Sequence, residues 1–448
     1  MVKFTLRGTG GAPGQTTGRV KVFKNISKIN LLNNETIIVA PFTTPKITPF
    51  LPKIKAIITE KGGITSHAAI IGREFGIPVI LGVENATKKL KNNQWVMVDG
   101  IEGKIEIFSK DSIQFAQWDI TSKCNLRCQH CRAWKLPTEE ELSTEEGKGL
   151  LSQLYGLKIQ VLNFSGGEPF LRKDIFKLLD YAKDFPLLTI TTNGILLLNK
   201  EYIKMLKPFK NIRISLSLDG LEKFHDNFRQ VSGTFKKAIS VVKNLTKESI
   251  RTSIRFTLTS FNEDEVEPLF DLVSKYKIES FNIRAVLPLG RADASMMPSA
   301  KRYQKILKNL FVKSKKKKIP IISGDPILLP LFPELLGKVW DEMGEKVLSE
   351  ICAGCLAGEE TLYIKPNGDV GVCAYVPKIV GNIKEQSLIE MINKTSLFQK
   401  LYNYREKLKG KCGKCKFKYL CGGCRAVALA LNKDLYAEDP RCLVYNNS

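Results

Sequence analysis

Short apolar runs separated by turns rich in glycine and proline dominate the N-terminal part of the chain. Runs bounded in this way predict β-strands. The predicted strands cover residues 36–39, 56–59, 78–81, 95–98 and 104–108. We therefore expect a compact β/α domain at residues 1–110.

Between residues 111 and 335, apolar runs alternate with longer amphipathic stretches, a pattern that predicts strands followed by helices. Repetition of this unit is expected of a parallel, barrel-like sheet. One predicted helix, 143–157, begins with Ser143-Thr-Glu-Glu146, the spacing of a capping box. The six predicted strands cover 117–121, 161–165, 188–192, 212–218, 253–259 and 280–286. We expect an α/β fold in which this region forms a partial (β/α)6 barrel similar to part of a TIM barrel.

Length and composition describe an ordinary globular protein. A chain of 448 residues is too long for one hydrophobic core, so about two to four domains are expected. No apolar run reaches the roughly 18 residues of a membrane span, and the start, Met1-Val-Lys-Phe4, lacks the apolar stretch of a signal peptide. We expect a cytoplasmic protein with no membrane partner.

The formal charge of +24 raises the question of a polyanionic partner. Basic proteins attract nucleic acids at low salt. Lysine is nevertheless spread along the whole chain, and only Lys313-Ser-Lys-Lys-Lys-Lys318 forms a block, as solvated helix ends often do. We interpret the charge as a general surface property and expect no nucleic-acid partner.

Three of the 11 cysteines lie within eight residues, directly after the apolar run 115–120. A reducing cytosol leaves clustered thiols available to metals, and no disulfide pairs three partners. Cys124, Cys128 and Cys131 therefore predict a loop that leaves a strand and wraps a metal centre. A cubane iron-sulfur cluster takes four ligands, so this loop would leave one iron open to bind a substrate or cofactor. A structural zinc knuckle is the alternative.

The other eight cysteines all fall in the last hundred residues or so, and eight is two full sets of four. Their spacing is typical of iron-sulfur or zinc ligation, and it does not distinguish two clusters from two zinc sites. These cysteines are Cys352, Cys355, Cys373, Cys412, Cys415, Cys421, Cys424 and Cys442.

His67 lies in a segment of the N-terminal domain that has a specific sequence pattern. Paired glycines at 62–63, then Thr65-Ser66 and an Ala-Ala-Ile-Ile run, predict a tight turn that opens a helix with His67 in its first turn. The free N–H groups and positive dipole end of a helix N-terminus favour phosphate. His67 is thus a candidate phosphoryl carrier, with hydroxyls of Thr65 and Ser66 available to the phosphoryl oxygens. A purely structural histidine is the alternative.

The segments 38–45, 56–70, 76–82 and 98–100 resemble the phosphohistidine swivelling domain of phosphoenolpyruvate-utilising enzymes. In that family the matching histidine is phosphorylated and swings between a nucleotide site and a pyruvate site. The rest of the chain is occupied by other motifs, so His67 has no phosphoryl donor in the same chain. Either a separate phosphoryl-donor protein supplies it, or the domain carries or docks something without phosphorylation.

The cysteine loop, together with Ser165-Gly-Gly-Glu-Pro169, Thr191-Thr-Asn-Gly194 and Ser215-Leu-Ser-Leu-Asp-Gly220, resembles radical S-adenosylmethionine enzymes. The resemblance implies a low-potential electron donor, such as a ferredoxin or flavodoxin, and reductive cleavage of S-adenosylmethionine to a 5'-deoxyadenosyl radical that abstracts hydrogen. His130, before the third cysteine, would pack near the adenine, whereas His225 is expected only to orient its neighbours by hydrogen bonding. The implied cofactor-binding residues are His130, Gly166, Gly167, Glu168, Asn193, Ser215, Ser217 and Asp219.

Residues 345–448 resemble the SPASM domain, the small cysteine-rich iron-sulfur extension of that family. The resemblance implies interleaved ligation of two auxiliary clusters, which with the first loop makes three [4Fe-4S] clusters. One set would be Cys352, Cys355, Cys373 and Cys424, and the other Cys412, Cys415, Cys421 and Cys442. Cys421-Gly-Gly-Cys-Arg-Ala426 looks most like haem, haem d1 and tungsten-cofactor maturases.

Three functions are consistent with these resemblances. The preferred one is a radical S-adenosylmethionine enzyme that matures a cofactor or other small molecule. The second is modification of a ribosomal peptide or protein, and the third is a non-catalytic electron-transfer or scaffold protein. The intact S-adenosylmethionine-contacting turns favour the enzymes over the scaffold.

Overall fold

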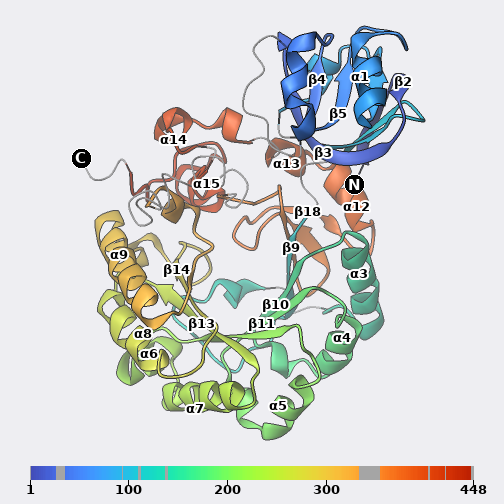
Figure 1. The fold of residues 1–448 in the computed structure, drawn as a ribbon. Coiled ribbons are helices and arrows are strands. Elements are labelled where there is room, and N and C mark those ends of the chain that lie inside the picture. Colours follow the sequence, from blue (N-terminus) through green and yellow to red (C-terminus); the bar gives the residue numbers. More distant parts are fainter. Residues whose placement is uncertain are drawn as a thin grey trace. The chain divides into compact units, whose positions relative to one another are not determined.

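A computed structural model describes residues 2–26, 36–92, 94–108, 113–136, 140–331, 354–401, 404–418 and 420–444. The chain divides into two compact units, Met1–Ser112 and Ile113–Ser448. Each has its own sheet (Figure 1).

The first unit is built on an eight-stranded sheet in the order β1-β8-β7-β3-β4-β5-β6-β2. The central strands β3 to β6 run parallel, and the outer strands pair antiparallel. The strands are β1 Val2–Arg7, β2 Thr9–Ala12, β3 Gln15–Val22, β4 Thr36–Ala40, β5 Ile54–Thr59, β6 Val79–Leu81, β7 Trp95–Asp99 and β8 Lys104–Phe108. The helices are the 3-10 helix η2 Pro45–Lys53, α1 His67–Phe75 and α2 Ala86–Lys89.

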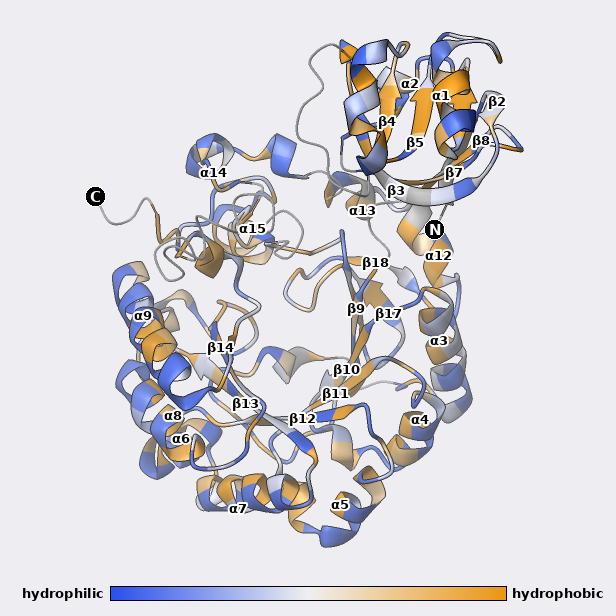
Figure 2. Ribbon diagram, viewed as in Figure 1, coloured by the Kyte–Doolittle hydropathy of each residue, from blue (hydrophilic) through white to orange (hydrophobic). Residues whose placement is uncertain are grey.

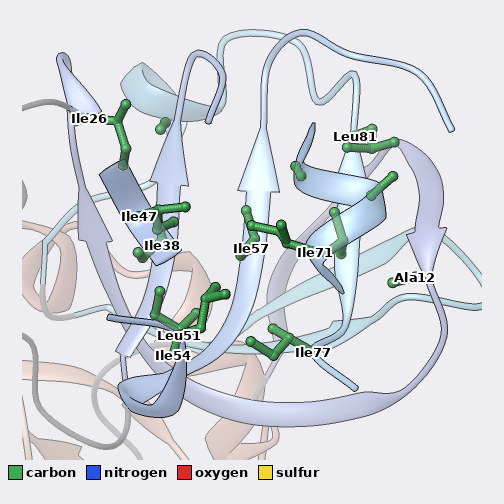
Figure 3. Close-up of a cluster of buried hydrophobic side chains, with 14 of the residues drawn as sticks. Ala12, Ile26, Ile38, Ile47, Leu51, Ile54, Ile57, Ile71, Ile77 and Leu81 are labelled. Atoms are coloured by element: carbon green, nitrogen blue, oxygen red, sulfur yellow. The ribbon is translucent and has the colours of Figure 1, made fainter. Parts of the chain in front are cut away.

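Both faces of this sheet are apolar because successive side chains of a strand point to opposite sides. Strand β4 is buried along its whole length, and Figure 2 shows β4 and β5 as almost entirely hydrophobic. On one face Ile38 and Ile57 pack with Ile47 of η2 and Ile71 of α1 (Figure 3). The other face has a second apolar cluster, so the unit has its own core on each side.

The second unit contains six parallel strands in sequence order, with helices on the outside of their curved wall (Figure 1). This is the predicted partial (β/α)6 barrel. The strands are β9 Phe115–Thr121, β10 Val161–Gly166, β11 Leu187–Thr192, β12 Ile212–Ser217, β13 Arg251–Leu258 and β14 Ser280–Ala285. The helices are α3 Thr144–Gly156, α4 Ile175–Tyr181, α5 Lys200–Leu206, α6 Glu222–Arg229, α7 Thr234–Lys247, α8 Val266–Val273 and α9 Ala300–Lys317.

The sheet continues past the barrel strands at both edges. The short strand β15 Ile321–Ile322 pairs with β14, and β16 Thr361–Ile364 pairs parallel with β9. Antiparallel strands β17 Asp369–Gly371 and β18 Ile379–Asn382 follow, so the cysteine-rich segment extends the same sheet. Helices α12 Leu388–Lys394, α13 Ser396–Leu401, α14 Gly410–Lys414 and α15 Arg425–Asn432 complete the unit. Pairing with β16 satisfies the N–H and C=O groups that an edge strand would leave open.

Most predicted elements are confirmed within a few residues. Helix α3 has the predicted capping box, since Ser143 accepts from the Glu146 N–H and the Glu146 carboxylate accepts from the Ser143 N–H. Helix α9 ends at Lys317, inside the lysine block. Strands β1 to β3 were not predicted, because glycines and charged residues interrupt their apolar pattern. Among the described residues, no helix is both long and apolar enough to cross a membrane.

Candidate active site

The carboxyl ends of the barrel strands surround a cavity in the second unit. Ligands of parallel α/β sheets bind at this end of the strands. The cavity brings together eight of the residues predicted from the sequence. They are Cys124, Cys128, His130, Cys131, Gly166, Gly167, Asn193 and Ser217.

The three thiols of the loop after β9 are free. The Leu126 N–H donates to the Sγ of Cys124 at 3.4 Å, and Arg229 Nη1 donates to the Sγ of Cys128 at 3.5 Å. Burial raises the pKa of Cys131, so this thiol needs a nearby cation to ionise. Three sulfurs that line one cavity fit a metal cluster, whose metal ions would stabilise the thiolates.

His130 is held against the wall of the cavity by stacking. Its ring lies 4.4 Å from the ring of Phe228 at an interplanar angle of 3°. Burial lowers the pKa of His130 to about 4, so the ring is neutral at pH 7. Its Nδ1 is buried without a hydrogen-bond partner among the described residues, which fits a site that awaits a polar ligand.

The glycine-rich turn after β10 packs against the chain that leads into the cysteine loop. A Cβ on Gly166 would lie 2.3 Å from the carbonyl oxygen of Thr121, and one on Gly167 would lie 2.1 Å from that of Lys123. Gly166 also has a φ of +116°. Only glycine fits both the conformation and this close approach.

Glu168 orders the next turn instead of lining the cavity. Its buried carboxylate accepts from the Thr192 hydroxyl at 2.7 Å and from the Asn193 N–H at 2.9 Å. Burial raises its pKa. Asn193 Nδ2 in turn donates to Asn125 Oδ1 at 2.8 Å, which links this turn to the cysteine loop.

Asp219 and Ser215 are buried and are not among the residues that line the cavity. Asp219 is fully buried, and its carboxylate forms an ion pair with Arg229 and accepts from the Thr257 N–H at 3.0 Å. Its backbone N–H donates to His225 Nδ1 at 3.2 Å, which is the orienting hydrogen bond expected of that histidine. These contacts hold α6, which carries Phe228 and Arg229, against β12 and β13.

Several charged and aromatic residues of the cavity were missed by sequence reasoning. Buried Asp119 accepts from Arg132 Nη2 and from the Tyr363 hydroxyl, both at 2.7 Å. Arg132, Arg255, Arg284 and Tyr375 line the cavity, whereas Asp119 and Tyr363 lie outside its lining. An available signal was arginine inside otherwise apolar strands, because a charge there must face the barrel interior or solvent.

The C-terminal cysteines fall into two neighbourhoods. The thiols of Cys355, Cys373 and Cys424 lie close enough to raise one another's pKa. In the second neighbourhood, Cys442 raises the pKa of Cys412, and Cys412 and Cys442 both raise the pKa of Cys421. Burial is the main cause of each raised pKa. Cys352 lies outside the described residues.

The chemistry of these sulfurs also fits metal ligation. Backbone N–H groups donate to the Sγ of Cys412, Cys415 and Cys421 at 3.3–3.5 Å, as is common around cluster sulfurs. Within the described ranges, no three His, Cys, Asp or Glu side chains already surround one point as metal ligands would. The cluster ligands therefore stay a prediction.

His67 lies in the first unit, at the predicted start of helix α1, with Ser66 as the N-cap. The ring is held by Thr43, which the sequence did not reveal, because its hydroxyl lies 2.9 Å from His67 Nδ1. Thr43, Lys61, Gly62 and Ser66 line a pocket together with His67. The Ser66 hydroxyl is buried without a partner among the described residues. Nε2 is thus the nitrogen left for chemistry.

Family comparisons match three parts of the chain. Residues 32–103 match the PEP-utilising enzyme mobile domain, 118–273 match the Radical SAM superfamily, and 355–416 match the SPASM iron-sulfur cluster-binding domain.

Individual proteins agree with this division. An AdoMet-dependent heme synthase of Methanosarcina barkeri is 32% identical over 73% of this chain and 95% of its own length. A probable phosphoenolpyruvate synthase of Methanothermobacter thermautotrophicus is 42% identical over 23% of this chain and 15% of its own length. The crystal structure of Streptococcus suis SuiB bound to S-adenosylmethionine superposes with a TM-score of 0.62 and 21% identity, covering 74% of this chain and 77% of SuiB.

Proposed function

The chain belongs to the radical SAM superfamily, and from this premise we propose that it generates a 5'-deoxyadenosyl radical to mature a tetrapyrrole or related cofactor. The observation that carries the proposal is one cavity lined by all three thiols of the CxxxCxxC loop, the glycine-rich turn and Ser217. The similarity to a heme synthase over 95% of that protein's length supports a tetrapyrrole as the cofactor that is matured.

Cys124, Cys128 and Cys131 would hold a [4Fe-4S] cluster with one iron left for S-adenosylmethionine. When bound, this group supplies the electron that cleaves S-adenosylmethionine and so starts hydrogen abstraction. The chain's own residues bind and orient. Gly166 and Gly167 present backbone to the ligand, Asn193 and Ser217 offer polar side chains, and His130 offers a buried nitrogen beside the third cysteine.

Glu168, Ser215 and Asp219 would act from behind this lining. Glu168 positions the Asn193 turn through its backbone N–H, and Asp219 fixes Arg229, which donates to Cys128. We propose them as residues that hold the S-adenosylmethionine site in shape.

Substitution Cys128→Ala tests the central proposal. Anaerobically reconstituted wild type should contain about twelve irons, from three four-iron clusters, and the variant about eight. The variant should lose dithionite-driven 5'-deoxyadenosine formation, whereas Ser152→Ala, at an exposed position of α3, should keep it. Formation of 5'-deoxyadenosine by Cys128→Ala would mean that the loop does not bind the reactive cluster.

The auxiliary cysteines would hold two further [4Fe-4S] clusters, in the interleaved sets expected from the sequence. The two neighbourhoods of thiols support these sets, with Cys352 joining Cys355, Cys373 and Cys424, and Cys415 joining Cys412, Cys421 and Cys442. Metal analysis of wild type distinguishes clusters from zinc. About four irons with bound zinc would disprove both auxiliary clusters.

Substrate identity is tested by metabolite profiles of wild-type and Cys128→Ala strains. A tetrapyrrole that accumulates only in the variant supports cofactor maturation. A ribosomal peptide that stays unmodified only in the variant would instead support the peptide-modifying alternative.

His67 is proposed as a phosphoryl carrier through Nε2, since Thr43 engages Nδ1. The donor would be a separate protein. Labelled phosphoenolpyruvate or ATP, with and without cell extract, should give acid-labile label on wild type and none on His67→Ala. Absence of label under every condition would favour docking without phosphorylation.

Further proposals concern partners, location and boundaries. The family implies a reductant and a substrate, and we propose a ferredoxin or flavodoxin as the electron donor in the cytoplasm. We propose domain limits of 1–110, 111–335 and 345–448, which contain the three family matches.

A further inference from the structure

Two arginines project from neighbouring barrel strands into the cavity. Arg255 lies on β13 and Arg284 on β14, and both line the cavity with Ser217 and Thr257. The strand register pairs Ser217 with Arg255 and Thr257 with Arg284, so these four side chains share one face of the sheet. The two guanidinium groups therefore stand on the wall next to the proposed S-adenosylmethionine site.

Tyr375, from the cysteine-rich segment, lies between the two arginines. Arg255 Nη2 donates to the Tyr375 hydroxyl at 3.3 Å, and the Arg284 guanidinium carbon lies 4.2 Å from the centre of the Tyr375 ring. The phenol thus orders both side chains without neutralising either charge. The guanidinium carbon of Arg132 also lies 5.6 Å from the centre of the Tyr375 ring, but Arg132 forms an ion pair with Asp119.

Neither Arg255 nor Arg284 forms an ion pair with a carboxylate in the described part of the chain. Three other arginines of this unit do, since Arg132 pairs with Asp119, Arg229 with Asp219, and Arg441 with Asp325 and Asp439. Buried Arg425 is held instead by the carbonyl oxygens of Leu435 and Ala437. The Nε of Arg284 is buried and has no hydrogen-bond partner among described residues. Burying a charged group without its partner is costly, so an anionic ligand would complete this wall.

We propose that Arg255 and Arg284 bind a carboxylate of the substrate and hold it beside the S-adenosylmethionine site. This inference rests on the proposed function and narrows the substrate to an anionic molecule, such as a tetrapyrrole with propionate side chains. The planar guanidinium donates two parallel N–H groups to a carboxylate, which fixes orientation as well as position. A carboxylate held there would place the rest of the substrate near the open end of the cysteine loop.

A competing explanation is that Arg284 balances the charge of an auxiliary cluster, because it also influences Cys373 and Cys424. The two roles differ in their measurable consequences. If Arg284 balances cluster charge, replacing it should change the iron content or the reduction potential of the auxiliary cluster. If Arg284 binds a carboxylate, replacing it should lower the affinity for carboxylates and leave the iron content and the reduction potential unchanged.

The test uses the reconstituted full-length protein and two porphyrin probes. Coproporphyrin III carries four carboxylates, and its tetramethyl ester has the same macrocycle without them. Porphyrin fluorescence titration should show that wild type binds the acid at least about tenfold more tightly than the ester, because charge-assisted hydrogen bonds to carboxylates are strong. Arg255→Gln and Arg284→Gln should each weaken binding of the acid by about tenfold or more and leave binding of the ester unchanged.

Controls separate this site from its neighbours. Arg284→Lys keeps the charge and should restore part of the affinity. Arg251 lies on β13, as Arg255 does, but it pairs with Glu279 and is not part of the cavity lining. The Arg251→Gln variant should therefore bind the acid as wild type does. Iron content, auxiliary-cluster potential and melting temperature should be unchanged in both glutamine variants.

Several results would overturn the inference. One is that wild type binds the acid and the ester equally well, and another is that both glutamine variants bind the acid as wild type does. A third is that Arg284→Gln loses iron or shifts the reduction potential of the auxiliary cluster. A fourth is that the glutamine variants bind S-adenosylmethionine more weakly but bind the acid as before. Failure of wild type to form 5'-deoxyadenosine at all would instead refute the proposed function. The two failures are thus distinguishable.

Discussion

At the scale of single residues, the buried carboxylates around the cavity are satisfied by particular partners. Asp219, in the loop after β12, links α6 and β13. Its side chain pairs with Arg229 of α6 and accepts from Thr257 of β13, while its backbone N–H donates to His225 of α6. Such buried groups are costly when a partner is removed, because desolvation is not recovered. Arg284 differs from these carboxylates because its Nε has no hydrogen-bond partner among the described residues, and for that reason it points to a ligand.

His225 makes the stability of the second unit depend on pH. Burial lowers its pKa to about 4, and the neutral ring accepts the Asp219 N–H. The unfolded chain takes up this proton near pH 6.5, so His225 costs stability as pH falls from about 6.5 towards 4. We expect it to contribute a loss of up to about 2 kcal/mol between pH 6.5 and 5, at about 1.4 kcal/mol per pH unit.

Comparison with His225→Gln, which does not titrate, measures this contribution. Urea unfolding of both proteins at pH 6.5, 5.75 and 5.0, followed by near-UV circular dichroism, should show a steeper loss for wild type. Parallel pH profiles would contradict the prediction.

At the scale of elements, local sequence signals determine where helix α3 begins, and packing determines how it docks on the sheet. Its start follows from the capping box, which any Ser-x-x-Glu at a helix start can form. Its docking depends on Gly147, where an added Cβ would lie 2.8 Å from the buried ring of Trp118 on β9 and 3.0 Å from Leu178 on α4. Close approach of helix and strand therefore requires the absence of a side chain at this position.

Two alanine substitutions in α3 test this interpretation. Gly147→Ala should lower the free energy of unfolding by about 1–3 kcal/mol, because Trp118 is fully buried and the well-packed core has no room for another methyl group. Gly149→Ala, where no atom lies within 4 Å of the added Cβ, should be neutral or stabilise by up to about 1 kcal/mol. Equal effects of the two substitutions in urea unfolding would contradict the packing explanation.

At the scale of the whole molecule, the two units are stabilised differently. The first contains apolar clusters on both faces of its sheet and none of the cysteines. In the second, the cysteine-rich segment is joined to the barrel through β16 and through the Arg441–Asp325 ion pair. Metal bound by that segment would therefore add to the stability of the second unit, since ligand binding stabilises the folded state.

Removal of the clusters should destabilise one unit selectively. After oxidation and chelation, hydrogen exchange should increase in peptides that cover residues 412–442 and stay unchanged in β4 and β5 of the first unit. Zinc-free, iron-free protein with unchanged exchange at 412–442 would mean that metal does not stabilise this segment. Matched loss of protection in β4 and β5 would mean that the stabilities of the two units are coupled.

The sequence by itself determined most strands of both units, the start of α1 at His67 and the cap of α3, because these depend on local periodicity and on side chains a few residues apart. Its motifs also named eight of the residues that line the cavity, since each motif lies at the end of a parallel strand and such strand ends meet. The roles of Glu168 and Asp219 behind that lining were not visible, because burial depends on contacts across strands.

Only the tertiary structure decided what surrounds those motifs. Thr43 meets His67 from 24 residues away, and Tyr375 meets Arg255 from 120 residues away. The pairing of β16 with β9 likewise joins segments that are far apart in the sequence. Local patterns carry no record of such pairings, because chain topology brings these groups together. Arg255 and Arg284 became informative for the same reason, since only the folded surroundings show that neither forms an ion pair with a carboxylate in the described part of the chain.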